Sequence, residues 1–81
     1  MTIMQRIAEC DNGIVAAWEN KTTDKRLEVR KSLFWTRRRP CYLMMCYAGG
    51  VFINGNNGLS RRQAAKAVSI WLDGNKKGGV R

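Results

Sequence analysis

The sequence predicts an α+β domain, in which an antiparallel sheet of three to five strands packs against one C-terminal helix at about residues 60–73. Three observations lead to this fold class. Apolar and polar residues alternate with a period of two over residues 27–35. Glycine-containing turn signals separate short β-favouring segments, and residues 60–73 combine helical spacing with a helix-start signal. The 81 residues correspond to a single domain.

The first predicted element covers residues 2–9, where the apolar spacing is compatible with either a helix or a strand. Ile3 and Ile7 are spaced as on one helix face, but the alternation also fits a strand loosely, and the strand is the preferred interpretation. A tight-turn signal, Asp11-Asn12-Gly13, leads into the β-favouring segment 14–18. These residues therefore predict an N-terminal hairpin.

The next predicted strand covers residues 27–35 and follows a polar turn at residues 20–25. One face of this strand carries Leu27, Val29, Leu33 and Trp35, with Lys31 as the misfit, and the other face carries Glu28, Arg30, Ser32 and Phe34. Three arginines and Pro40 come next. They are expected to end the strand, because proline lacks the N–H group that a β-ladder needs.

Residues 41–47 are apolar at almost every position, which predicts a central strand with the helix on one side. Gly49-Gly50 predicts a tight turn into another strand at residues 51–53. Residues 54–58 are rich in asparagine and glycine, so we expect a flexible loop there.

The C-terminal helix has predicted signals at both ends. Ser60 is the expected N-cap, Gln63 completes a capping box, and Leu59 is placed to pack on Ala64. Gly74 is the expected C′ residue. The stripe expected to face the sheet is apolar and contains Ala64, Ala67, Val68, Trp71 and Leu72. The stripe expected to face solvent is polar and contains Arg62, Lys66, Ser69 and Asp73. The domain thus covers residues 1–74, followed by a basic, flexible tail at 75–81.

The charge balance favours a negatively charged partner. Fifteen Lys and Arg face six Asp and Glu, which gives a formal net charge of +9 without any histidine. No apolar segment has the length of a signal peptide or membrane span, so we expect a soluble, cytoplasmic protein. The three cysteines lack metal-site spacing and are expected to be reduced packing residues. No catalytic constellation is recognisable, and we therefore expect no enzymatic activity, no cofactor and no metal.

Basic side chains form three groups, and no carboxylate lies between Glu28 and Asp73 to neutralise them along the chain. These basic residues and the helix-start serine are the candidate site for nucleic acid or another anion: Arg30, Lys31, Arg37, Arg38, Arg39, Ser60, Arg61, Arg62 and Lys66. Each group alone would serve equally well as solvated charge that keeps a small protein soluble.

Two arginines at a helix start face the positive end of the helix dipole, which is unfavourable without a ligand. The free N–H groups after Ser60 form an anion site to which Arg61 and Arg62 add charge-assisted donors. We therefore expect alanine at both positions to leave folding intact or slightly improved, while weakening the ligand.

The pattern Gly58-x-Ser60-Arg61-Arg62-x-Ala64, followed by alanines, resembles the start of the final helix of double-stranded-RNA-binding domains. The resemblance covers residues 42–72 and includes the preceding hairpin. It implies that Arg61 and Arg62 grip phosphates across the groove, although Ala65 stands where that family prefers a lysine. The predicted order of strands and helix is also similar in outline to the DNA-binding domains that precede phage integrases.

The leading hypothesis is a small, basic, non-enzymatic protein that binds DNA or RNA mainly through phosphate contacts. Phe34, between basic residues, is a candidate for stacking on bases. The alternative is a phage or mobile-element inhibitor or adaptor, of the anti-defence type, that binds an acidic host protein or a nucleoprotein complex. A membrane partner is not expected. A free strand edge allows pairing of two copies into a homodimer.

Overall fold

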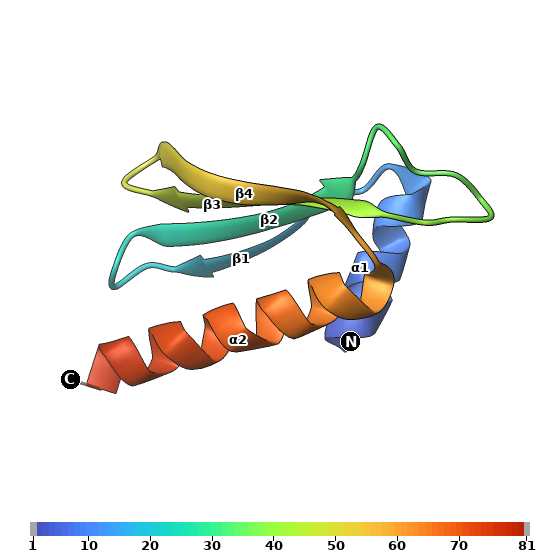
Figure 1. Cartoon of the computed structure of the whole chain (residues 1–81). Helices are drawn as coiled ribbons and strands as arrows, with labels where there is room; N and C mark the ends of the chain where they lie inside the picture. Colours follow the sequence, from blue (N-terminus) through green and yellow to red (C-terminus); the bar gives the residue numbers. More distant parts are fainter. Residues whose placement is uncertain (1, 81) are drawn as a thin grey trace.

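The computed structural model describes the backbone of residues 2–80 and the side chains of residues 2–74. The elements in chain order are α1 (Ile3–Glu9), a short 3₁₀ helix η1 (Cys10–Asn12), β1 (Ala16–Asn20), β2 (Lys25–Lys31), β3 (Tyr42–Ala48), β4 (Val51–Leu59) and α2 (Arg61–Val80). The strands pair in sequence order into one four-stranded antiparallel sheet. Figure 1 shows α2 running beneath this sheet, with α1 beside the first turns of α2. The predicted α+β class, with its antiparallel sheet and C-terminal helix, is confirmed.

The core lies between the two helices and one face of the sheet, which we call the inner face. Its buried apolar residues come from every layer: Ile7, Cys10, Ala16, Leu27, Val29, Tyr42, Met44, Ala64 and Val68. The small Ala64 side chain permits close approach of α2 to the sheet, while Trp71 and Leu72 pack against the core from its edge. The apolar stripe predicted for the helix is therefore the face that packs. The opposite sheet face, called the open face below, carries no helix.

The N-terminal segment is a helix, so the predicted strand at residues 2–9 and the N-terminal hairpin are wrong. Thr2 and Gln5 form a capping box: the Gln5 N–H donates to Thr2 Oγ1 at 3.1 Å, and the Thr2 N–H donates to Gln5 Oε1 at 2.7 Å. Gly13, with φ +85°, follows η1 in the left-handed conformation. Asp11-Asn12-Gly13 therefore ends a helical segment rather than joining two strands.

The largest differences in strand boundaries are at the ends of β2 and β4, while β1 and β3 are shifted by one or two residues from the prediction. β2 ends at Lys31, and Leu33 and Phe34 form a turn outside the sheet. Residues 54–58 belong to β4 rather than to a flexible loop. Their pairing with the β3 backbone overrides the low strand propensity of asparagine and glycine. Gly55 allows β4 to approach β3 closely, since a Cβ there would lie 2.5 Å from the Met44 carbonyl oxygen.

The start of α2 confirms the predicted capping box, but the predicted end does not hold. The Gln63 N–H donates to Ser60 Oγ at 3.1 Å, and the Ser60 N–H donates to Gln63 Oε1 at 2.9 Å. Gly74 lies inside α2, whose backbone continues to Val80. A glycine lowers helix stability without stopping the helix when its neighbours remain helical. The side chains of the predicted basic tail, residues 75–81, lie outside the described residues.

Gly74→Ala is expected to raise the free energy of unfolding by up to about 1 kcal/mol, because alanine is the better helix former and its Cβ meets no atom within 4 Å. Urea denaturation with far-UV circular dichroism measures this change. If Gly74 instead occupied a left-handed C′ position, the same substitution would lower stability.

Candidate functional site

Asp11 binds three side chains from three other parts of the chain. The Trp35 indole N–H donates to Asp11 Oδ1 at 3.0 Å, the Tyr42 hydroxyl donates to the same oxygen at 2.6 Å, and Arg61 Nη2 donates to Asp11 Oδ2 at 2.7 Å. Arg61 Nε also donates to the Tyr42 hydroxyl at 3.2 Å. We call these four residues the Asp11 junction. It fixes η1, the segment between β2 and β3, β3 and the first residue of α2 at one end of the sheet.

The electrostatics of the junction favour a charged Arg61 and a neutral Tyr42. Burial raises the pKa of Tyr42, and its hydrogen bond to the Asp11 carboxylate acts in the same direction. The hydrogen bond from Arg61 to Tyr42, with the nearby Asp11 charge, raises the pKa of the Arg61 guanidinium. The unfavourable position of Arg61 at a helix start is therefore offset within the protein, by a carboxylate 50 residues earlier in the chain. Arg61 therefore has a structural partner in Asp11, and its contact with an external anion stays a prediction.

Lys31, the misfit in the predicted alternation, is attached to the same region. Its Nζ donates to the Asp11 backbone carbonyl at 3.3 Å and lies 3.9 Å from the centroid of the Trp35 ring. This cation–π contact lets a charged side chain sit at the end of an apolar strand face. Lys31 therefore attaches the end of β2 to η1 and to Trp35, as Arg61 attaches the start of α2 to η1.

Three exposed arginines occupy the connection between β2 and β3. Residues 36–39 form a turn closed by backbone bonds in both directions, from the Thr36 N–H to the Arg39 carbonyl at 3.3 Å and from the Arg39 N–H to the Thr36 carbonyl at 3.1 Å. The Arg39 N–H also donates to Thr36 Oγ1 at 2.9 Å. We call residues 36–39 the basic turn. Within residues 2–74, the side chains of Arg37, Arg38 and Arg39 have no hydrogen-bond or ion-pair partner.

The outward face of α2 carries the remaining free cations of the predicted site. Arg62 and Lys66 are exposed and have no side-chain partner in the part of the chain whose side chains are described. Ser60 caps the helix with its hydroxyl, as expected. Figure 1 shows the start of α2 at the same end of the molecule as the β2–β3 connection. The structure thus brings Arg62 to the same end as the basic turn.

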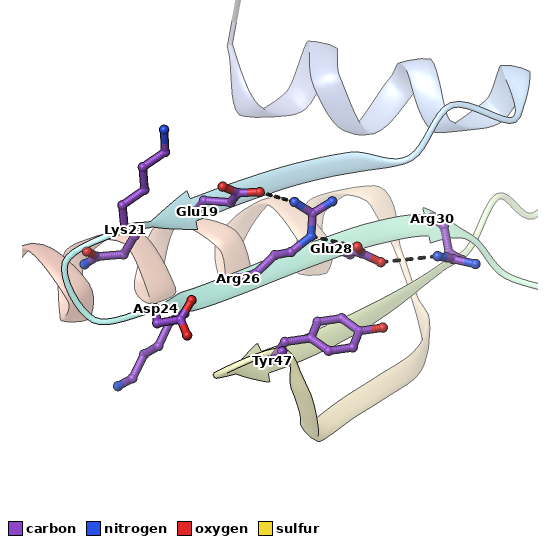
Figure 2. Close-up of a pocket in the computed structure, with 10 residues that line it drawn as sticks. Glu19, Lys21, Asp24, Arg26, Glu28, Arg30 and Tyr47 are labelled. Atoms are coloured by element: carbon purple, nitrogen blue, oxygen red, sulfur yellow. Dashed lines mark hydrogen bonds and ion pairs between the residues drawn. The ribbon is translucent and has the colours of Figure 1, made fainter.

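Arg30 lies apart from these residues, on the open face, in a row of ion pairs. Arg26 pairs with Glu19 on β1 and with Glu28 at 2.8 Å, and Arg30 pairs with Glu28 at 3.2 Å. Figure 2 shows these side chains lining a hollow beside Tyr47 and the β1–β2 turn. The hydrogen bond from Arg26 lowers the pKa of Glu28, and Arg30 adds to this effect. Arg30 is therefore already paired, whereas the basic turn is not.

Sequence reasoning missed the residues that organise this end of the molecule. Asp11 was identified only as part of a turn, and Trp35 and Tyr42 only as strand residues. Trp35 and Tyr42 lie 24 and 31 residues from Asp11 along the chain, and sequence patterns of a few residues carry no information over such separations. The stretch between Glu28 and Asp73 contains no carboxylate of its own, but Asp11 from the N-terminal segment binds three of its residues.

Comparison with protein-family models finds no match, and neither the curated proteins nor the solved structures contain a match for this chain. The resemblance to double-stranded-RNA-binding domains stays a prediction. Among the described residues, no helix is long and apolar enough to cross a membrane. The same residues contain no cluster of histidine, cysteine or carboxylate side chains suited to a metal ion.

Arg61→Ala is expected to lower the free energy of unfolding by about 1–2 kcal/mol, because the Asp11 carboxylate and the Tyr42 hydroxyl lose a charged donor. Urea denaturation at neutral pH provides the measurement. Arg62→Ala is the matched control, since this neighbouring arginine is exposed without a described partner, and we expect a change within about 0.5 kcal/mol. Equal losses in both variants would contradict the assignment of Arg61 to the junction.

The Glu28 ion pairs predict an acid-sensitive part of the stability. Because the pKa of Glu28 is lower in the folded state than its ordinary value of 4.5, its contribution is complete above pH 4.5 and is lost as the pH falls through the folded-state pKa. Glu28→Gln should therefore flatten the fall in unfolding free energy between neutral pH and acid, measured by urea denaturation at a series of pH values. Parallel curves for the two proteins would show that Glu28 contributes nothing to this fall.

Proposed function

We propose that this protein binds nucleic acid through phosphate contacts, with the basic turn as the main contact and Arg62 and Lys66 as additional ones. The observation that carries the proposal is the difference between paired and free cations. Arg26, Arg30 and Arg61 each have a carboxylate partner. The three arginines of the basic turn have none among the described residues, although they are adjacent and held on a closed backbone turn.

Three neighbouring guanidinium groups repel one another and gain most from a partner that carries several negative charges. A nucleic-acid backbone supplies such charges at regular spacing, and its binding releases condensed counterions. Guanidinium groups also match phosphate oxygens with paired donors. The free cations at this end supply charge without an evident base-reading surface, so the proposed binding has little dependence on sequence.

No catalytic role is part of this proposal. The described side chains include no histidine, and the most buried thiol, that of Cys10, has a pKa raised mainly by burial. A raised pKa keeps this thiol protonated and poorly nucleophilic. Its Sγ lies 3.4 Å from the Val29 carbonyl oxygen, within the core.

A second candidate function is docking on a protein, as an inhibitor or adaptor. The observation in its favour is an apolar tip on the β3–β4 hairpin, where Val51, Phe52 and Ile53 are 67%, 54% and 57% exposed. Phosphate binding has no use for these side chains. On this alternative, the basic turn would face an acidic surface of the partner, and the apolar tip would add buried area.

The test is the salt dependence of binding to a generic single-stranded and a generic duplex oligonucleotide, starting at about 50 mM salt. Affinity should fall linearly on a log–log plot. Arg37→Ala with Arg38→Ala should weaken binding and reduce the slope by roughly 1.5–2, because two phosphate contacts are lost. Arg39 is kept, so that the variant loses two charges.

The matched control is Lys21→Ala with Lys25→Ala, which removes the same charge from the exposed residue after β1 and from the exposed first residue of β2. This variant should keep the wild-type slope. Equal effects of both pairs would indicate a diffuse charge effect and contradict a site at the basic turn. Absence of any binding at about 50 mM salt would reject the proposal and favour the protein-docking alternative.

A further inference from the structure

The turn at residues 32–35 presents two apolar side chains to solvent. The Trp35 N–H donates to the Ser32 carbonyl at 3.1 Å, and the Phe34 N–H donates to Ser32 Oγ at 3.1 Å. Leu33 and Phe34 therefore occupy the two middle positions of a closed turn, where they are 99% and 72% exposed. We call this pair the apolar apex.

The backbone on both sides of the apolar apex is fixed to the body of the protein. Ser32 is buried, and its N–H donates to the Cys41 carbonyl at 3.1 Å, which joins the two ends of the β2–β3 connection. Trp35 is held by the Asp11 carboxylate and by Lys31 over its ring. These contacts hold the turn in an orientation in which Leu33 and Phe34 are exposed.

Leucine and phenylalanine are unusual at these positions. The middle residues of turns are commonly proline, asparagine, aspartate or glycine, which are stable in water and suit turn geometry. Burying a leucine and a phenylalanine would stabilise the fold, and this fold does not use that stabilisation. A partner that covers the apolar apex is the physical use for such a pair.

The chemistry beside the apolar apex identifies the partner. The basic turn begins directly after Trp35, so the exposed ring of Phe34 lies only a few residues along the chain from three free guanidinium groups. A partner that combines planar apolar surfaces with closely spaced negative charges fits both. Unpaired nucleic-acid bases with their phosphates have this combination, and stacking on an exposed ring favours single strands.

A duplex fits the apolar apex less well. Its bases are already stacked on one another, so insertion of a side chain requires unstacking of a base step. We infer that the apolar apex, with Phe34 as the stacking ring, makes this protein prefer single-stranded DNA or RNA over duplex. This inference rests on the proposed function and adds the class of nucleic acid to it.

The experiment compares an oligothymidylate with a duplex of equal length, in wild type and in Phe34 variants, at one salt concentration and across a salt series. Phe34→Ala should lower the affinity for the single strand roughly five- to a hundred-fold, the range of one lost stacking contact, and change duplex binding much less. The salt slope should stay unchanged, because no charge is removed. The thermal midpoint should also stay unchanged, because Phe34 is largely exposed.

Two further variants separate stacking from general apolar contact. Phe34→Tyr keeps a ring and should retain single-strand affinity, whereas Phe34→Leu keeps apolar surface without a ring and should lose affinity as the alanine variant does. If all three variants bind both oligonucleotides like wild type while Arg37→Ala with Arg38→Ala reduces the slope, the inference fails and the proposed function stands. If wild type binds no oligonucleotide, the proposed function fails as well. Binding to phosphatidylserine vesicles that Phe34→Ala abolishes, with oligonucleotide binding unchanged, would assign the apolar apex to a lipid surface and overturn the inference.

Discussion

The carboxylate of Asp11 holds together parts of the chain that are 24, 31 and 50 residues apart from it. Each of its partners comes from a different element, so this one group sets the position of the β2–β3 connection relative to both helices. The site is partly shielded from water, with the Asp11 side chain 24% exposed, and a charged acceptor in such a setting binds its donors more strongly than a neutral one. Loss of this acceptor would leave a buried Tyr42 hydroxyl and a guanidinium at a helix start without compensation. In a small domain with a limited core, that is a large share of the stability.

The six acidic residues are too few to neutralise the fifteen basic ones, and their placement decides which cations stay free. Asp11 neutralises Arg61, and Glu28 serves both Arg26 and Arg30. Arg26 connects β2 to β1 through Glu19, Arg30 pairs within β2, and Arg61 joins the start of α2 to η1 and β3. The arginines of the basic turn and the outward cations of α2 are left without such partners among the described residues. At the end of the molecule where β2 leads into β3 and α2 begins, free cations thus lie near cations that are already paired.

Local signals predicted much of the fold, and ambiguous local spacing or distant partners explain the features that they missed. The alternation in β2, the apolar run of β3, the Gly49-Gly50 turn and the Ser60 capping box all act over a few residues, so they could be read from the sequence. The helix at residues 3–9 was missed because its apolar spacing suits two periods, and the deciding feature was the Thr2–Gln5 capping box. The sequence predicts only residues 51–53 of β4, because residues 54–58 owe their strand structure to pairing with β3 and not to their own strand propensity. The predicted site residues stay a prediction, but the structure shows which of them have partners inside the protein. The three arginines of the basic turn could be identified from composition alone. The contacts of Lys31 and Arg61 could not, because both residues bind Asp11 and no local pattern connects them to it.

The junction that stabilises the fold also sets the geometry of the proposed binding surface. Trp35 stands between the apolar apex and the basic turn, and its indole is held by Asp11 on one side and Lys31 on the other. A free ten-residue connection would lose conformational entropy on binding, which weakens the complex. Because this connection is closed at Ser32–Cys41, at residues 32–35 and at residues 36–39, that cost is largely met during folding. On the proposed function, Arg61 and Lys31 contribute without touching the partner, because they hold the backbone that carries Phe34 and the basic turn.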